Sequence, residues 1–216
     1  MKYIDIHTHN EKKCAETEVV NLFAHEVNLI SGVHHCSIGF HPWHIGQYDE
    51  SEMINNLHEF ANFPQVLAIG ECGIDIAITD ILAQERIFLK QAGIAENIKK
   101  PLIIHCVRAY NEIIRLRKLI HAKMPWIIHG FNGNKEQADQ LVKNGFYLSF
   151  GEKLMFSEQL MDVFLSVPTE KIFFETDEGK ASIREIYSFV SGILKMDIED
   201  LKTKINENFK YVFLHG

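Results

Sequence analysis

Short apolar runs recur along the whole chain, and their number and order limit the folds that it can adopt. The runs are rich in β-branched side chains, which is typical of buried strands. The predicted strands are Tyr3–Ile6, Val19–Ala24, Cys36–Phe40, Val66–Ile69, Leu102–Ile104, Trp126–Ile128, Phe146–Phe150 and Ile172–Phe174. Segments with helical periodicity fill most of the later gaps: Met53–Phe60, Ala83–Ile98, Tyr110–Lys123, Lys135–Lys143 and Ser157–Leu165. Strand and helix therefore alternate.

This alternation indicates an α/β fold of parallel units joined by right-handed crossovers. Eight strands favour a compact (β/α)8 TIM barrel, regular or distorted, over the alternative of an open doubly wound sheet. The tail Met196–Phe213 is predicted to form one or two closing helices. We find no linker or internal repeat in residues 1–216 and expect one domain. Because about 250 residues are typical of such a barrel, its loops must be short.

Ligand-type side chains stand at the carboxyl ends of five predicted strands. They are His7, His9, Glu71, His105, His129 and Asp177. The carboxyl ends of barrel strands meet at one face, so we expect these side chains to converge on one cavity. Alternation along the first strand places the imidazoles of His7 and His9 on the same side, where both can reach one ion.

Taken singly, each of these residues has an ordinary structural explanation, such as a hydrogen-bonded strand-end histidine or a helix-capping carboxylate. Six together would be costly to bury unless a metal compensated them. Four histidines with two carboxylates exceed what one ion needs, so we predict two divalent cations. Such a pair acidifies a water for attack and polarises the scissile bond, which indicates hydrolysis. We expect Asp177 also to accept the proton of that water and Glu71 to bridge the ions.

The bulk composition is that of an ordinary globular protein, with 46% hydrophobic residues and a formal charge of −7. That charge argues against a broad basic surface, so contact with a polyanion would depend on local cations or bound metal. The four cysteines, Cys14, Cys36, Cys72 and Cys106, form no C-x-x-C pair. No signal peptide or membrane-spanning segment is indicated. We therefore expect a cytoplasmic protein.

Several motifs occur in an order that resembles the TatD family of metal-dependent deoxyribonucleases, within the amidohydrolase-like barrel superfamily. DIHTH (Asp5–His9), GFHPWH (Gly39–His44) and GECGID (Gly70–Asp75) resemble the family's opening segments. QERIF (Gln84–Phe88) is similar to the start of its next helix, and PLIIHC, IIHGF and FFETD resemble its later ligand strands. NENFKYVF (Asn206–Phe213) is similar to its closing helix. The resemblance extends almost end to end.

The resemblance implies that His7, His9 and Asp177 hold one ion, that His105 and His129 hold the second, and that Glu71 lies between them. The ions would be zinc, manganese or magnesium. His41 would be a substrate-facing or acid–base residue beside the metals, able to donate a proton near neutral pH. The alternative is a strand-end histidine packed against Pro42 and Trp43. Substrate-binding roles are considered for Arg108, as a phosphate or carboxylate clamp, and for His44, which could instead support the metal ligands; surface exposure is the alternative for each. Asp75 would orient Arg108 or a ligand histidine, or cap a turn.

Three departures from the family pattern bear on the substrate. Arg108 follows His105 by three residues where the family has two, the loop IAITDILAQ is short, and EGKASIREIY leads directly into a helix after Asp177. Lys153, Lys180 and Arg184 could contact phosphates, but a solvated surface charge is the expected role of each. Tyr147, Phe150 and Phe156 could stack on bases, but we expect them in the core.

We therefore predict a hydrolase that cleaves phosphodiester bonds in DNA or short oligonucleotides. The alternatives are an amidohydrolase acting on a small amide, ester or phosphoester, and a catalytically silent metal-binding barrel. No membrane and no obligate protein partner are expected. Charge around the cleft would separate the two enzymes, because a nuclease needs cations along a groove and a small-molecule hydrolase needs a closed pocket.

Overall fold

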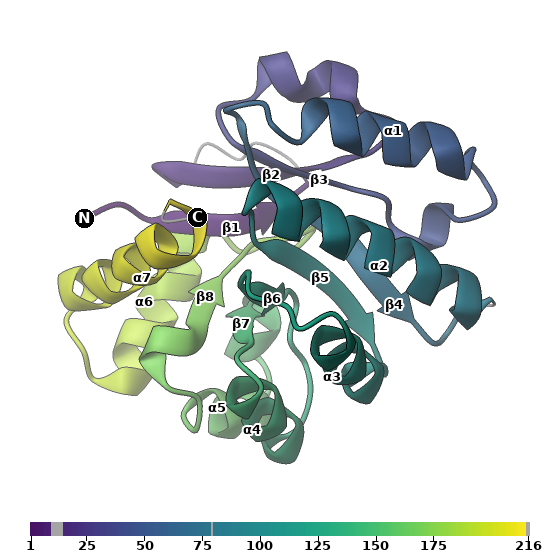
Figure 1. Ribbon diagram of the computed structural model, residues 1–216. Helices are drawn as coiled ribbons and strands as arrows, with labels where there is room; N and C mark the ends of the chain where they lie inside the picture. Colours follow the sequence, from purple (N-terminus) through teal and green to yellow (C-terminus); the bar gives the residue numbers. More distant parts are fainter. Residues whose placement is uncertain (10–14, 79, 215–216) are drawn as a thin grey trace. The chain divides into compact units, whose positions relative to one another are not determined.

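The computed structural model describes residues 1–9, 15–78 and 80–214, so Cys14 and residue Thr79 of the short loop lie outside the described residues. The described residues group into two compact units. The first unit contains those of Met1–Val20 and His129–His215, and the second contains Asn21–Ile128. Each unit has its own strands, helices and buried core (Figure 1).

Eight strands run in chain order through the sheet of the described residues, from β1 to β8. They are β1 (Ile4–Thr8), β2 (Thr17–Phe23), β3 (Cys36–Gly39), β4 (Val66–Asp75), β5 (Leu102–Val107), β6 (Trp126–Ile128), β7 (Tyr147–Phe150) and β8 (Ile172–Phe174). The α-helices are α1 (Glu50–Phe60), α2 (Ile81–Ile98), α3 (Tyr110–Leu119), α4 (Lys135–Lys143), α5 (Glu158–Phe164), α6 (Ile183–Leu194) and α7 (Ile198–Phe213). The short 3-10 helices are η1 (Val27–Gly32), η2 (Pro42–His44), η3 (Glu152–Met155) and η4 (Thr169–Lys171). This alternation confirms the predicted (β/α)8 class.

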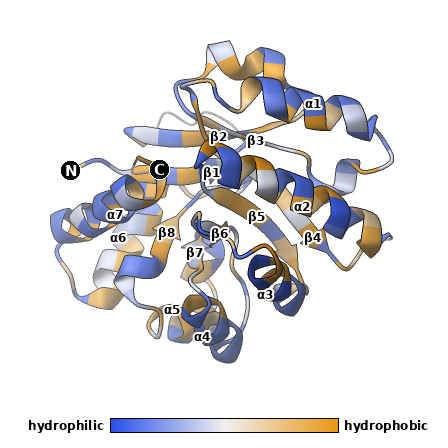
Figure 2. Ribbon diagram, in the orientation of Figure 1, coloured by the Kyte–Doolittle hydropathy of each residue, from blue (hydrophilic) through white to orange (hydrophobic). Residues whose placement is uncertain are grey.

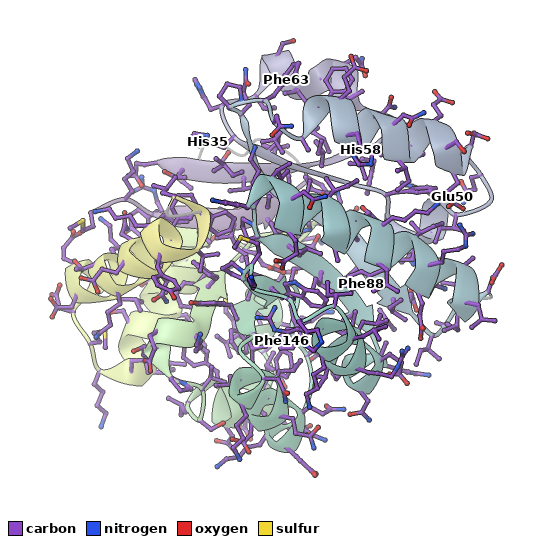
Figure 3. The ribbon with its side chains drawn as sticks, in the orientation of Figure 1. His35, Glu50, His58, Phe63, Phe88 and Phe146 are labelled. Atoms are coloured by element: carbon purple, nitrogen blue, oxygen red, sulfur yellow. The ribbon has the colours of Figure 1, made fainter. Side chains whose placement is uncertain are left out.

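In the second unit, β3, β4, β5 and β6 pair in parallel, with Ile69 opposite Leu102 and Leu102 opposite Trp126. Helix α2 packs on β4, and its residue Phe88, labelled in Figure 3, meets the buried Trp126 ring edge to face at 5.2 Å between centroids. Figure 2 shows β5 hydrophobic along most of its length, whereas α1 and α2 alternate hydrophobic and hydrophilic residues. The core of this unit therefore lies between the strands and one face of each helix.

In the first unit, β7 pairs with β8 in parallel, and β1 pairs with β2. Strand β8 lies next to β1, where Thr8 forms a parallel bridge with Asp177. Helices α6 and α7 pack on this pair, since the Tyr187 hydroxyl donates to the Ile4 carbonyl and the Asn208 amide donates to the Ile172 carbonyl. The carboxyl ends of β8 and β1 are thus held together.

Some boundaries differ from the sequence prediction. Strand β4 continues six residues past the predicted end at Ile69, because residues Cys72–Asp75 pair with β5. Glu71 therefore lies within a strand rather than after it. The tail forms a single helix, α7, and α6 precedes it as a separate helix that begins with a capping box at Ser182 and Glu185. Among the described residues, no helix is long and apolar enough to cross a membrane.

Candidate metal and active-site residues

In the first unit, the side chains of His7, His9 and Asp177 form a group of possible metal ligands. Their ligand atoms all lie within 4.8 Å of one another. Nε2 of His7 lies 3.8 Å from Oδ1 of Asp177, and Nε2 of His9 lies 3.4 Å from the same oxygen. The two imidazole rings meet edge to face with centroids 5.2 Å apart. Two imidazole nitrogens and a carboxylate form a donor set that suits a divalent transition metal.

The backbone around Asp5 and Thr176 holds this group in place. The Asp177 amide donates to the His7 carbonyl at 2.9 Å, which joins the end of β8 to β1. The buried Asp5 carboxylate accepts hydrogen bonds from the Thr176 hydroxyl at 2.7 Å and from the Thr176 amide at 3.1 Å. Burial raises the pKa of Asp5 to about 7, against the lowering effect of these hydrogen bonds. Residues on either side of the ligands are thus tied together across two strands.

Asp177 and Glu175 share a second group of possible ligands with His129. Glu175 is fully buried, and its Oε1 accepts a hydrogen bond from the Gly130 amide at 2.6 Å and lies 3.4 Å from Nδ1 of His129. Glu175 lies within the FFETD motif and is not among the ligands predicted from the sequence. The signal that could have identified it is a carboxylate that directly follows an apolar strand, since a buried carboxylate needs a compensating partner.

A small cavity of about 90 Å³ opens beside these residues in the first unit. Its walls include Glu175, Asp177, Gly130 and Lys153. Of the cations considered for phosphate contact, Lys153 lines this cavity, whereas Arg184 pairs with Glu16 and lies over the Tyr3 ring. A cavity of this size suits one small group of a substrate rather than a whole nucleotide.

In the second unit, His41, Glu71 and His105 form a further group of possible ligands. Glu71 is 3% exposed, and its Oε1 lies 2.8 Å from Nδ1 of His105 and 3.2 Å from Nε2 of His41. The two imidazole rings lie 4.5 Å apart between centroids. One buried carboxylate oxygen therefore contacts two histidines, an arrangement that fixes the orientation of both rings.

The position of Glu71 depends on residues from neighbouring strands. Its amide donates to the Asn21 side-chain oxygen at 2.8 Å, and the Ser37 hydroxyl donates to the same oxygen at 3.2 Å. Strand β3 passes so close that a Cβ atom on Gly39 would lie 2.5 Å from the Glu71 carbonyl oxygen, so only glycine fits there. Asn21 is not among the predicted site residues, because nothing in its local sequence indicates a contact with a strand two positions further along the sheet.

Asp75 lies on the other side of His105, at 3.5 Å from its Nε2. It also accepts hydrogen bonds from the Trp43 indole at 2.8 Å and from the Ala77 amide at 2.8 Å. Burial acts to raise the pKa of Asp75. The hydrogen bonds from Trp43, Ala77 and His105 outweigh this effect and hold the pKa of Asp75 below its usual range. Asp75 therefore contacts the ligand-type histidine His105 and also caps the turn at Ala77, whereas contact with Arg108 is not among its hydrogen bonds and ion pairs in the described residues.

The two tentative substrate contacts lie in different surroundings. His44 packs between Phe23 and His25, and burial lowers its pKa to about 4, with the nearby His41 and His25 adding to the effect. It is therefore neutral at pH 7. Arg108 is exposed directly after β5, in the left-handed region with φ of 56°. Its guanidinium makes no hydrogen bond or ion pair with the residues that the structure describes.

The aromatic residues expected in the core divide in two ways. Tyr147 and Phe150 are buried, as expected, whereas Phe156 is 80% exposed because it follows η3 at the end of a turn.

Cys36 and Cys72 are buried free thiols, and Cys106 is a partly buried one. Burial raises the pKa of the Cys36 thiol to about 12, so this thiol is inert near neutral pH.

Known proteins resemble this chain over most of its length. The profile of the family described as TatD related DNase matches residues 14–214. An uncharacterized metal-dependent hydrolase of Methanocaldococcus jannaschii is 26% identical over 96% of this chain and 95% of its own length. A protein of Escherichia fergusonii named as the 3'-5' ssDNA/RNA exonuclease TatD is 30% identical over 66% of this chain and 58% of its own length.

Solved structures share the fold. The TatD homologue YJJV of Escherichia coli K12 superposes with a TM-score of 0.85, at 16% identity, over 99% of this chain and 98% of its own. At that identity the likeness concerns the fold alone. The profile match extends over nearly the whole chain and includes every ligand-type residue described above except His7 and His9, which precede it. The chain belongs to the TatD family of metal-dependent hydrolases.

Proposed function

We propose that this protein hydrolyses phosphodiester bonds in DNA or short oligonucleotides with the help of two divalent cations. The observation that carries the proposal is the group formed by His7, His9 and Asp177, whose ligand atoms lie within 4.8 Å of one another. The name of the Escherichia fergusonii relative, an exonuclease of single-stranded DNA and RNA, supports the choice of substrate. Histidine-rich donor sets favour zinc or manganese, and the family resemblance adds magnesium.

When bound, the cations lower the pKa of a water and stabilise charge on the phosphoryl oxygens. His7 and His9 would hold the first cation. Asp177, whose side chain is 40% exposed, accepts the proton of the attacking water at its second carboxylate oxygen. The hydrogen bonds between Thr176 and Asp5 hold the backbone next to Asp177 in place.

His105 and His129 are proposed as ligands of the second cation, and Glu71 as a ligand shared by both. This assignment stays a prediction from the family resemblance. Contacts with Glu71 support it for His105, and contacts with Glu175 support it for His129. His41 is proposed to donate a proton to the leaving oxygen, because its imidazole lies among the ligand-type residues with Nε2 at 3.2 Å from Glu71. A cytoplasmic location is likewise a prediction, which is based on the cysteine pattern.

The test is a paired measurement on metal-reconstituted protein. Metal per chain is measured by elemental analysis, and hydrolysis is followed for a single-stranded oligonucleotide and for bis-p-nitrophenyl phosphate. We expect Asp177→Asn to lose at least one ion and to cut the oligonucleotide at least about 100-fold more slowly. Glu178→Gln is the matched control, because it removes the same charge from the neighbouring exposed residue.

The results distinguish the nuclease from the two alternative functions. Two ions per chain and oligonucleotide cleavage that disappears in Asp177→Asn would support the nuclease. Cleavage of the small ester alone would replace it with a hydrolase of small amides, esters or phosphoesters. Metal without any hydrolysis would favour the silent barrel, and absence of bound metal would overturn the proposal.

A further inference from the structure

Trp43 is the exposed aromatic residue of the second unit that lies nearest its ligand-type histidines in the structure. It is 57% exposed, although a side chain of this size is usually more deeply buried. Its ring meets His41 edge to face at 5.0 Å and His105 at 5.7 Å between centroids. A large aromatic surface thus stands in solvent beside the group formed by His41, Glu71 and His105.

Three hydrogen bonds fix Trp43 in this position. Its indole nitrogen donates to Asp75 at 2.8 Å, its amide donates to Nδ1 of His41 at 3.1 Å, and its carbonyl accepts from the Gln47 side chain at 2.7 Å. The polar edge of the indole is therefore satisfied within the protein. A ring held in this way loses little conformational entropy when a ligand packs against it.

Further rings extend this surface along η2 and the end of β2. His44 lies 5.8 Å from His41 and 4.5 Å from Phe23, and His25 stacks on Tyr48 at 4.1 Å. Tyr48 is itself 39% exposed. These side chains are aromatic, so the surface offers faces for stacking.

We propose that Trp43 is a base-stacking residue, which holds one unpaired nucleobase of the substrate next to His41 and His105. The inference rests on the proposed nuclease function and specifies how that function selects its substrate. Every nucleobase has a π face, so aromatic side chains bind single strands with little regard for sequence. A base within a duplex is already stacked on both sides, so this residue favours single strands and frayed ends.

The chain offers a direct reporter, because Trp43 and Trp126 are its two tryptophans and Trp126 is fully buried. The variant Trp126→Phe leaves Trp43 as the one indole fluorophore. Zinc-loaded full-length protein is titrated with a phosphorothioate hexamer of deoxyadenosine and, separately, with an abasic phosphorothioate hexamer. We expect the first to quench Trp43 fluorescence and the second to leave it nearly unchanged.

Affinity variants separate stacking from a structural role. Trp43→Ala is expected to weaken binding of the deoxyadenosine hexamer by about 5- to 150-fold and to leave binding of the abasic hexamer unchanged. Trp43→Phe loses the hydrogen bond to Asp75. Because it keeps an aromatic ring for stacking, it should retain most of the affinity. If Trp43→Phe is as weak as Trp43→Ala, or if both hexamers weaken equally, the stacking role is wrong.

The outcome for stacking is independent of the outcome for catalysis. Wild-type cleavage of an ordinary oligonucleotide without base-dependent quenching would overturn the stacking role and keep the nuclease. Base-dependent quenching without cleavage would keep the stacking site and overturn the nuclease.

Discussion

Among single residues, Thr176 has an effect on the candidate site that its position next to Asp177 alone would not suggest. Its hydroxyl donates to the buried Asp5 carboxylate at 2.7 Å and lies 3.1 Å from the Thr8 hydroxyl. Thr176→Val leaves Asp5 with one partner fewer in a buried place. We expect the free energy of unfolding to fall by about 1–3 kcal/mol and the affinity for the first cation to fall about tenfold. Urea unfolding and metal titration measure the two effects.

The matched control is Thr203→Val on α7. The Thr203 hydroxyl donates to the Glu199 carbonyl of its own helix in an exposed place, so its loss should change stability by less than about 0.5 kcal/mol. Equal losses of stability in both variants, with metal affinity unchanged in both, would show that Thr176 does not position Asp177.

The ligand-type residues could be selected from the sequence because each stands near the carboxyl end of an apolar run. Asn21 and Glu175 could not be selected with equal force. Asn21 is defined by its hydrogen bonds with the Glu71 amide and the Ser37 hydroxyl, which lie 50 and 16 positions away. Glu175 is defined by its burial and by the Gly130 amide. Partners far along the chain leave no local periodicity by which such residues could be identified.

Between elements, helix α2 holds the ends of two strands through buried glutamines. Gln91 accepts from the Phe40 amide at 2.8 Å and donates to the Phe40 carbonyl at 3.0 Å, and Gln84 pairs with the backbone of Asp75 in the same way. Gln91→Leu would leave both Phe40 groups buried without these bonds. We expect it to cost about 2–4 kcal/mol of stability and to lower kcat more than it raises KM, because His41 follows Phe40.

An exposed glutamine provides the comparison. Gln140→Leu on α4 makes the same substitution at an exposed position and should shift the free energy of unfolding by less than about 0.5 kcal/mol. If Gln91→Leu were as mild, the strand ends would be held by the sheet alone. The sequence predicts no role for Gln84 of the QERIF motif, because the backbone groups that it pairs with belong to Asp75 of another element.

Helices α1 and α2 are joined by Glu50, labelled in Figure 3, which forms ion pairs with Arg86 and with Lys90. Hydrogen bonds from Arg86 and Lys90 lower the pKa of Glu50. A carboxyl with a lowered pKa stabilises the folded state above its ordinary value of 4.5, and this contribution is lost as pH falls through the folded pKa. The pairs are largely exposed, so Glu50→Gln should cost about 0.5–1 kcal/mol at pH 7 and almost nothing near pH 3.

Urea unfolding at the two pH values tests this expectation. Repeating it in about 0.5 M salt, which screens most of the attraction between exposed charges, tests the electrostatic origin of the effect. Persistence of the Glu50→Gln effect at the acidic pH would mean that packing rather than charge carries it.

For the chain as a whole, bound metal should raise thermal stability. A ligand that binds only the folded state at about 100 times its Kd adds roughly 2.7 kcal/mol, which for this length is about 5–10 °C in Tm. Dialysis against a chelator should remove that increment, and His9→Ala should remove most of it even with metal present. His58→Ala is the control, because His58 is exposed on α1 and belongs to none of the ligand groups among the described residues. Equal Tm values with and without metal would contradict the proposed sites.

The number of phosphate contacts sets the salt dependence of substrate binding. Of the cations considered for phosphate contact, Arg184 is paired with Glu16, which leaves Arg108, Lys153 and the exposed Lys180 as candidates. For single strands, log K falls with log salt at about −0.7 per neutralised phosphate, so three contacts predict a slope of about −2.1. Fluorescence titration of an oligonucleotide at fixed metal concentration and between roughly 50 and 200 mM salt measures this slope. Because stacking is not screened, affinity should persist at the higher salt. A slope steeper than about −3 would instead indicate a cationic groove and would require more phosphate contacts than these three residues provide.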